Sequence, residues 1–334
     1  MSGFEVLQSG PFVSVQDCGR PGMMRFGVTA SGPMDRTAFH ILRAALGGDA
    51  TFSAIEVSLG GLTVRATGNM TVGFAGGEFS LSLNQTPLSP WSVFSMQSGD
   101  VLSIRAGTQG SWGYLGVCGQ IVSPAWLGST AAHLTTGLGG QAVRPGDGIE
   151  IQSPTQRTDL HASLPIAEFS VFDSTVRAIP GPQDQHFSRQ SLDDLATKAF
   201  VISKDYDRMG MRLSGPSLRP EAALSIPSEA LVRGSVQVPG HGDPIILLAE
   251  HQTTGGYPKI ATIISADQDR LTQARSGQSL RFELVDTLTA VNAARLHQAR
   301  VSAYIDSLPQ WRGTLADRLG RLNLISGVTS GDAD

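Results

Sequence analysis

The side chains best suited to chemistry lie in one short segment of the second half of the chain. Residues 250–259 read Glu-His-Gln-Thr-Thr-Gly-Gly-Tyr-Pro-Lys, between apolar runs at 245–249 and 260–264. This pattern predicts a loop between two buried strands, where Gly255-Gly256 lets the backbone approach a ligand or bind an anion. Lys259, one of only three lysines, could hold an oxyanion or a phosphate. The alternative is a tight hairpin with an exposed lysine, which would not need this concentration of polar side chains.

Two further segments concentrate charge in a chain where charge is scarce. Gln16, Asp17 and Arg20 precede Pro21-Gly22. They could present a carboxylate and a guanidinium to a small polar or carboxylate-bearing ligand. An internal Asp–Arg pair that fixes the loop explains the pattern equally well. The segment 205–212 reads Asp-Tyr-Asp-Arg-Met-Gly-Met-Arg and allows the same two interpretations.

No common cofactor motif accompanies these segments. Residues 137–142 fit GxGxxA, but Pro145 follows too closely for the helix that would receive a pyrophosphate. The sequence has no GxxxxGK[ST], GxSxG or HExxH motif. A metal site at His241, Asp243 and His251 is not expected, because glycine-rich strand connections often carry such residues. Cys18 lacks an identified histidine partner and is interpreted as a packing residue.

Composition narrows the class of protein. The 334 residues exceed the roughly 250–300 at which one core usually stops growing, so two domains are expected. Only 16% of the residues are charged, and the chain contains 39 Gly and 18 Pro, which together indicate turn-rich β structure. A formal net charge of −4 argues against nucleic-acid binding. Two isolated cysteines and an N-terminus without signal-peptide character predict a cytoplasmic protein.

The elements that position these residues are predicted to be mostly short strands. Apolar runs bounded by Gly or Pro favour a sandwich or barrel, and they lie at 4–7, 54–59, 62–66, 71–74, 101–104, 112–117, 148–151, 169–172, 199–202, 244–249, 260–264 and 279–284. Helices are expected from Pro33 to Gly47-Gly48, after Ser191, over 265–277 and over 289–308. The tail after Ser326 is predicted to be disordered.

The two halves share motifs in the same order. Ser31-Gly32-Pro33 precedes Ser98-Gly99 in the first half, and Ser214-Gly215-Pro216 precedes Ser276-Gly277 at a similar interval in the second. We interpret this as a duplicated β domain, with the polar stretch 153–163 as linker. The predicted units are 1–163, 164–286 and a helical C-terminal appendage at 287–334.

Six ordered blocks carry a family resemblance, and they lie at 15–22, 31–35, 56–61, 207–216, 234–239 and 252–262. They resemble the biotin-dependent carboxyltransferase family that includes allophanate hydrolase subunit 2, the antagonist of the KipI kinase inhibitor and the C subunit of ATP-dependent 5-oxoprolinase. The resemblance runs from about residue 4 to about residue 284. It implies two cyclophilin-like β-barrel domains, in agreement with the repeat.

The resemblance best fits a subunit of an ATP-dependent 5-oxoprolinase, which opens the lactam of 5-oxo-L-proline to L-glutamate. It implies a KipI or allophanate hydrolase subunit 1-like partner, a LamB/YcsF-like partner, and ATP with Mg in the complex. No covalently attached biotin is expected, because the chain has no Met-Lys-Met site. The alternatives are the carboxyltransferase component of a urea carboxylase and a regulatory antagonist of a KipI-type kinase inhibitor.

Charge clustering motivates the roles assigned to individual residues. Asp17 or Asp207 is the candidate base or orienting group, and Lys259 is the candidate for stabilising an oxyanion or phosphorylated intermediate. Arg20 or Arg212 is the candidate for holding the substrate carboxylate. The full predicted substrate-binding set is Gln16, Arg20, Arg212, Gln237, Gln252, Thr253, Thr254, Gly255, Gly256 and Tyr257.

Overall fold

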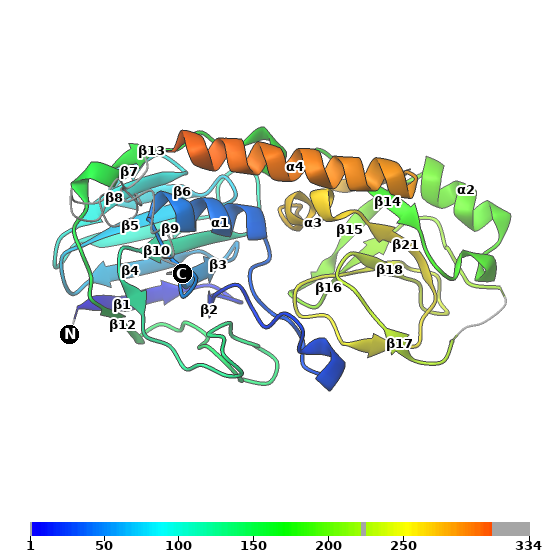
Figure 1. Ribbon diagram of the computed structural model, residues 1–334, viewed down its shortest axis with the longest axis horizontal. Coiled ribbons are helices and arrows are strands. Elements are labelled where there is room, and N and C mark those ends of the chain that lie inside the picture. Colours follow the sequence, from blue (N-terminus) through cyan, green and yellow to red (C-terminus); the bar gives the residue numbers. More distant parts are fainter. Residues whose placement is uncertain (1, 222–224, 309–334) are drawn as a thin grey trace, which may run out of the picture.

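The computed structural model describes residues 2–221 and 225–308. Its two β-rich halves lie side by side, and a long helix, α4 (Thr287–Ser307), runs along both of them (Figure 1). Ala162–Ser163 is the last strand of the first half, and the barrel of the second half begins at Thr175.

The first half consists of two sheets whose strand pairs are antiparallel. In order across the sheet, the seven-stranded one contains β11 (Gln120–Ile121), β12 (Gly148–Gln152), β1 (Gly3–Ser9), β4 (Leu62–Ala66), β9 (Val101–Arg105), β6 (Ser80–Leu83) and β7 (Thr86–Leu88). The six-stranded one contains β13 (Ala162–Ser163), β8 (Ser92–Met96), β5 (Met70–Ala75), β10 (Gly113–Val117), β3 (Ala54–Val57) and β2 (Ser14–Gln16).

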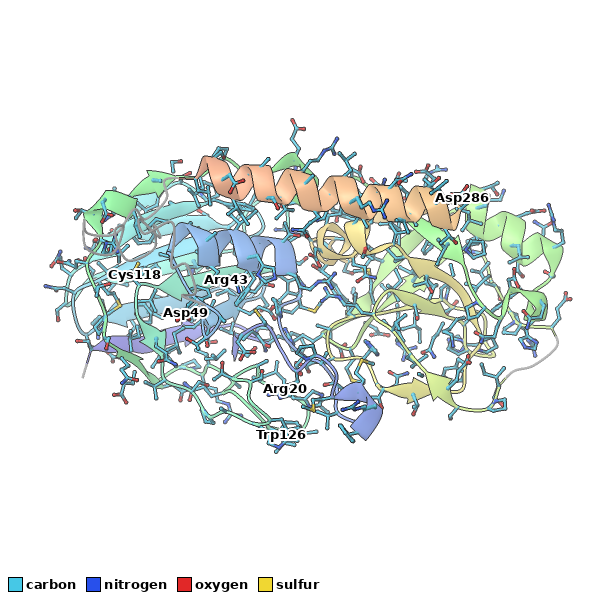
Figure 2. All side chains as sticks on the ribbon, in the orientation of Figure 1. Arg20, Arg43, Asp49, Cys118, Trp126 and Asp286 are labelled. Carbon is cyan, nitrogen blue, oxygen red and sulfur yellow. The ribbon has the colours of Figure 1, made fainter. Side chains whose placement is uncertain are left out.

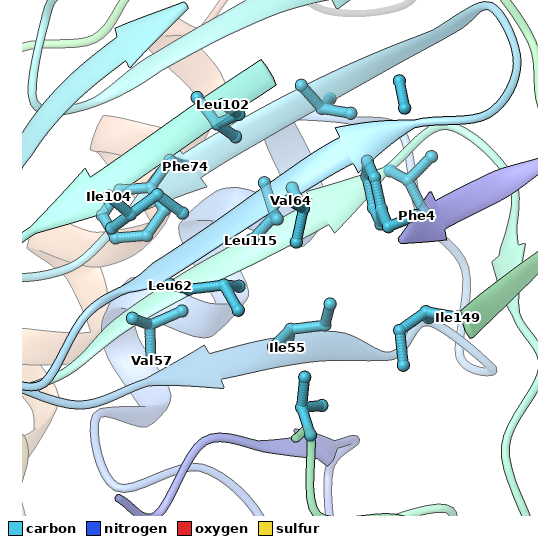
Figure 3. Close-up of a cluster of buried hydrophobic side chains, with 14 of the residues drawn as sticks. Phe4, Ile55, Val57, Leu62, Val64, Phe74, Leu102, Ile104, Leu115 and Ile149 are labelled. Carbon is cyan, nitrogen blue, oxygen red and sulfur yellow. The ribbon is translucent and has the colours of Figure 1, made fainter. Parts of the chain in front are cut away.

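A hydrophobic core joins these two sheets. Alternation along β4 buries Leu62 and Val64 on the inner face, where they meet Ile55 and Leu115 of the other sheet (Figure 3). Inward-facing residues of both sheets form one buried cluster, as expected for a sandwich.

The helix α1 (Arg36–Ala45) covers the outer face of the six-stranded sheet. Gly73 and Gly116, opposite each other on β5 and β10, leave room for this contact. A Cβ at Gly73 would lie 2.9 Å from one methyl carbon of Leu42 on α1, and a Cβ at Gly116 would lie 3.2 Å from the other. Side chains at these two positions would push α1 away from the sheet.

The second half is a closed barrel. The strand order is β14 (Thr175–Pro180), β21 (Lys259–Ile263), β18 (Ser235–Gln237), β19 (Ile245–Leu247), β16 (Gly210–Ser214), β15 (Ala199–Tyr206) and β22 (Ser279–Leu284). Parallel pairing of β14 with β22 closes it, and the other pairs are antiparallel. A separate ribbon pairs β17 (Glu229–Ala230) with β20 (Thr254–Gly255).

The predicted class, mainly β with few helices and a helical C-terminal segment, is confirmed. The barrel closes in the second half, whereas the strands of the first half form two sheets. The predicted strand at 169–172 is wrong, because a 3-10 helix, Glu168–Ser170, lies there. The predicted tail after Ser326 lies outside the described residues.

Side-chain caps move two helix starts from their predicted positions. α1 begins after Asp35 rather than at Pro33, because the Asp35 carboxylate accepts a hydrogen bond from Ala38 N at 2.8 Å. α2 (Arg189–Thr197) begins after Ser188, whose hydroxyl accepts from Ser191 N at 3.0 Å. α3 (Ser265–Thr272) is shorter than the predicted 265–277, and α4 begins two residues before its predicted start.

Gln273, at the end of α3, connects the two halves. Its Oε1 accepts from Ser111 N at 2.9 Å and Trp112 N at 3.1 Å, and its Nε2 donates to the Asp35 carboxylate at 2.7 Å. Burial, and then the negative charge of Asp269, raise the pKa of Asp35 to about 7. Gln273 Nε2 also donates to Trp112 O at 3.0 Å, so a single amide satisfies four buried polar groups of the first half.

We expect Gln273→Ala to lower the free energy of unfolding by about 2–4 kcal/mol, because it leaves buried N–H groups without an acceptor. Urea denaturation followed by circular dichroism measures the change. Gln190→Ala on α2 is the control, since among the described residues that exposed side chain bonds only Asp194, and it should shift stability by less than about 0.5 kcal/mol. Equal midpoints for the two variants would show that the Gln273 contacts do not stabilise the fold.

Candidate functional site

A buried arginine of the second half reaches carboxylates from both halves. Arg208 is 2% exposed, and its Nε donates to Glu250 Oε1 at 2.6 Å. Its Nη1 donates to Glu56 Oε1, and its Nη2 donates to Gly32 O at 2.7 Å. Burial alone would lower the pKa of Arg208, but the charges of Glu56 and Glu250 outweigh it and raise the pKa above its usual value.

The first half holds Glu56 in a fixed orientation. Its Oε2 accepts from Met34 N at 2.8 Å and from the Tyr114 hydroxyl at 2.8 Å. The same hydroxyl accepts from Asp35 N at 2.7 Å. Burial, followed by the charges of Glu56 and Asp35, raises the pKa of Tyr114 well above its usual value, so Tyr114 acts here as a neutral donor.

The second oxygen of Glu250 faces a histidine from the first half. Glu250 Oε2 and His133 Nε2 lie 4.0 Å apart, and His133 Nδ1 lies 2.7 Å from the Thr136 hydroxyl. A carboxylate and an imidazole at this separation can share a proton through a small movement or a water molecule. Glu250 lies in the segment predicted to carry chemistry but was assigned no role there, and His133 was not predicted, because no motif links the two segments.

Lys259 is buried rather than exposed, which contradicts the exposed-lysine alternative. The residue is 6% exposed, and its Nζ donates to the Glu229 carboxylate. Gln183 fixes the pair, because its Oε1 accepts from Lys259 N at 3.1 Å and its Nε2 donates to Glu229. The Glu229 side chain is 42% exposed, so an incoming anion could compete for the ammonium group from the solvent side.

Next to Lys259, two glutamines face the glycine loop. Gln237 pairs in register with Lys259 and is 1% exposed. Its Oε1 accepts from Gln252 Nε2 at 3.3 Å, and its Nε2 has no partner among the described residues. A Cβ at Gly255 would lie 2.9 Å from Gln237 Nε2, so only glycine leaves space beside this donor. The Gln237 amide nitrogen, a buried donor without a partner among the described residues beside a glycine that has no side chain, is suited to binding a carbonyl oxygen of a ligand.

The remaining loop residues line the β17–β20 ribbon. The carbonyls of Thr253 and Gly256 accept backbone hydrogen bonds from the segment 226–231 at 3.0 and 2.7 Å. Thr254 is exposed, and Tyr257 is 43% exposed. Pairing with a neighbouring segment therefore fixes this part of the loop, and its side chains lie at the surface.

Asp17 fastens two loops of the first half to each other. Its Oδ1 accepts from Gly19 N at 2.8 Å and from the Ser129 hydroxyl at 2.6 Å, and its Oδ2 accepts from Thr130 N at 2.7 Å. These contacts support a structural role. The predicted role of Asp17 as a base stays a prediction.

Arg20 is likewise held by backbone rather than by Asp17. Its Nε donates to Trp126 O at 3.0 Å, its Nη2 donates to Ala131 O, and its guanidinium lies 5.1 Å from the centroid of the Trp126 ring (Figure 2). Nη1 has no partner among the described residues. Gln16 Nε2 donates to Ala132 O at 3.1 Å. Asp17 and Arg20 therefore do not form the internal pair considered from the sequence, because each bonds its own set of partners.

In the segment 205–212, Arg208 is the residue that lies buried between Glu56 and Glu250. Asp207 Oδ1 accepts from Met209 N at 2.8 Å and Gly210 N at 3.1 Å, which closes a turn. Arg212 is exposed on β16. The candidate roles of Asp207 and Arg212 stay predictions, and the described residues contain no cluster of His, Cys, Asp and Glu arranged to hold a metal.

Comparison with known proteins defines the class of the chain. Its fold matches the crystal structure of the Kluyveromyces lactis urea carboxylase with a TM-score of 0.80 at 21% identity, over 93% of this chain and 30% of that one. It matches TTHA0988 with a TM-score of 0.75 at 28% identity, over 84% of this chain and 55% of that one. The chain belongs to the family of the carboxyltransferase domain, subdomain A and B, whose model matches residues 26–284.

Curated relatives are similar over most of the chain. The C subunit of 5-oxoprolinase from Haemophilus influenzae is 33% identical over 91% of this chain and 97% of its own length. The Escherichia coli protein of the same name is 32% identical over 83% of this chain and 90% of its own length. The putative urea carboxylase of Emericella nidulans is 31% identical over 87% of this chain but only 25% of its own length. No described helix is long and apolar enough to cross a membrane.

We expect Arg208→Met to lower the free energy of unfolding by about 3–5 kcal/mol, because Glu56 and Glu250 lose their shared cation while remaining buried. Urea denaturation measures the change. The triple variant Arg208→Met/Glu56→Gln/Glu250→Gln should regain most of the loss, because it removes the unpaired charges as well. Arg65→Met is the control, since its ion pair with Glu5 is largely exposed. A triple variant no more stable than the single one would contradict the electrostatic explanation.

Proposed function

We propose that this chain is the C subunit of an ATP-dependent 5-oxoprolinase, which opens the lactam of 5-oxo-L-proline to L-glutamate. The observation that carries the proposal is that the alignment covers nearly the full length of both this chain and its relative. The alignment spans 91% of this chain and 97% of a relative named as the C subunit of 5-oxoprolinase, whereas the urea carboxylase relative extends far beyond it. A chain with the dimensions of that subunit is expected to act with partner chains.

The chemistry of lactam opening fits the polar groups around the glycine loop. A lactam is a resonance-stabilised amide, and phosphorylation of its oxygen by ATP would make the carbonyl carbon open to water. Gln237 Nε2 is a free buried donor for the amide oxygen. Lys259 supplies a positive charge for the oxyanion or phosphorylated intermediate once that species competes with the exposed carboxylate of Glu229. His133 and Glu250 are the pair available to take a proton from water.

The proposed complex contains a KipI or allophanate hydrolase subunit 1-like chain and a LamB/YcsF-like chain. Relatives named as subunits support the existence of partner chains. ATP, with Mg, is a substrate of the whole complex in this proposal. In this proposal, ATP binding by the complex does not require a nucleotide-binding motif in this chain. The proposal also includes no covalently attached biotin on the chain.

A second candidate function is the carboxyltransferase step of a urea carboxylase. The observation that favours it is the family match over residues 26–284, together with 31% identity to the putative urea carboxylase of Emericella nidulans. In that case the same loops would bind biotin and urea. A regulatory antagonist of a KipI-type inhibitor would instead bind its partner tightly without turnover by any complex.

Co-expression with the neighbouring genes, followed by assays of ATP-dependent glutamate release and of urea carboxylation, tests the proposal. We expect glutamate release from 5-oxoproline. Carboxylation of urea alone would overturn the 5-oxoprolinase assignment in favour of the second candidate. Stable association without either reaction would favour the regulatory function.

Within an active complex, Lys259→Ala should lower the rate of glutamate release by at least about 100-fold, since it removes the charge that stabilises the intermediate. Lys204→Ala is the matched control, because Lys204 is exposed and the change removes the same charge. It should leave the rate within about twofold. Co-purification of each variant with its partners shows that the complex has assembled, and a fully active Lys259→Ala complex would exclude the proposed role of this lysine.

A further inference from the structure

A groove with charged and apolar walls lies between α1 and α4, on the side where the long helix crosses the first half (Figure 1). The groove has a volume of about 660 Å³, within the range of small-molecule sites. α1 contributes Arg36, His40 and Arg43, which share one face of the helix. α3 contributes Ser265 and Asp269 to the lining, and α4 contributes His297 and Gln298 together with the apolar side chains of Ala294, Val301 and Ile305.

The two arginines of α1 that line the groove differ in the partners of their side chains. Arg36 Nε donates to Asp269 Oδ1 at 2.9 Å, and Asp269 also accepts from the Thr37 hydroxyl at 2.9 Å. The side-chain nitrogens of Arg43, by contrast, make one contact among the described residues, 3.8 Å from Nη1 to the Cys18 sulfur. A thiol is a weak acceptor, and the exposed carboxylate of Asp49 acts on Arg43 through its charge without a hydrogen bond among the described residues, so Arg43 keeps donors for a ligand (Figure 2).

His40 adds a second unsatisfied group one turn away. Its Nδ1 is buried and has no partner among the described residues. Burial, followed by the charge of Arg43, lowers the pKa of His40, whereas the charge of Asp269 acts in the opposite direction. The residue as a whole is half-buried, and a buried ring nitrogen without a hydrogen bond destabilises the protein unless a ligand satisfies it.

We propose that this groove binds a small molecule through a phosphate group, with Arg43 and His40 as its ligands. Arg43 and a protonated His40 together supply two positive charges, which match a phosphate dianion rather than a single carboxylate. α3 begins at the same groove with Ser265 and has no side-chain cap, so its positive end favours an anion there. The proposal does not depend on which reaction the complex catalyses.

Titration calorimetry on the full chain, with inorganic phosphate as the probe, tests the site. Arg43→Ala and His40→Ala should each weaken binding by at least about tenfold, and Arg43→Lys should weaken it less than Arg43→Ala. Arg295→Ala is the matched control, because Arg295 is exposed on α4 and does not line the groove. It should change the affinity by less than about twofold.

The pH dependence gives an independent measurement. Sulfate is the probe here, because it stays a dianion from pH 6 to pH 8. The bound anion should raise the pKa of His40, so affinity should rise as pH falls, with uptake of one proton on binding. The groups facing His40 are Arg36 and Arg43 on its own helix, Asp269 on α3 and His297 on α4. Proton uptake should therefore disappear in His40→Ala but persist in His297→Ala.

Two outcomes would overturn the proposal. One is the absence of measurable phosphate binding to the full chain at millimolar concentration. The other is phosphate binding with unchanged affinity in both Arg43→Ala and His40→Ala, when circular dichroism shows that these variants are folded. Binding that is lost in these two variants and kept in Arg295→Ala supports the site, and a nucleotide or another phosphorylated compound that binds more tightly than phosphate would identify the natural ligand.

Discussion

The guanidinium of Arg208, buried between Glu56 of the sandwich and Glu250 of the barrel, is the interaction on which the arrangement of the two halves depends. Neither carboxylate could remain buried without this shared cation, because an unpaired charge in a protein interior is strongly destabilising. This buried cation therefore joins a carboxylate of each half, alongside the contacts of Gln273 and Asp269. It also fixes Glu250, whose other oxygen faces His133.

A polar interface of this kind differs from a hydrophobic one in what it specifies. Apolar surfaces tolerate sliding, whereas each buried donor and acceptor needs a partner at a defined position. Gln273 and Asp269 illustrate this, since each serves several groups of the other half. The halves are thus held in one relative orientation, which a site with contributions from both of them requires.

Local sequence signals were enough to predict the mainly β class and the loop at 250–259, whereas the role of Lys259 stays a prediction. They worked because strand alternation, glycine pairs and charge scarcity are properties of neighbouring residues. Glu56 and His133 were missed as site residues, since only the tertiary fold brings them to Arg208 and Glu250. The start of α1 was misplaced because the preference of proline for a first helical position was weighed without the Asp35 side-chain cap, which starts the helix at Arg36.

The pairing of Lys259 with Glu229 bears on when the proposed reaction can occur. In the isolated chain the lysine already has an anionic partner, so its charge is not free to stabilise an intermediate. Glu229 belongs to a two-residue strand, is 42% exposed in its side chain, and is held mainly by Lys259 and Gln183. An intermediate that uses the charge of Lys259 must therefore first displace the carboxylate of Glu229 from the ammonium group.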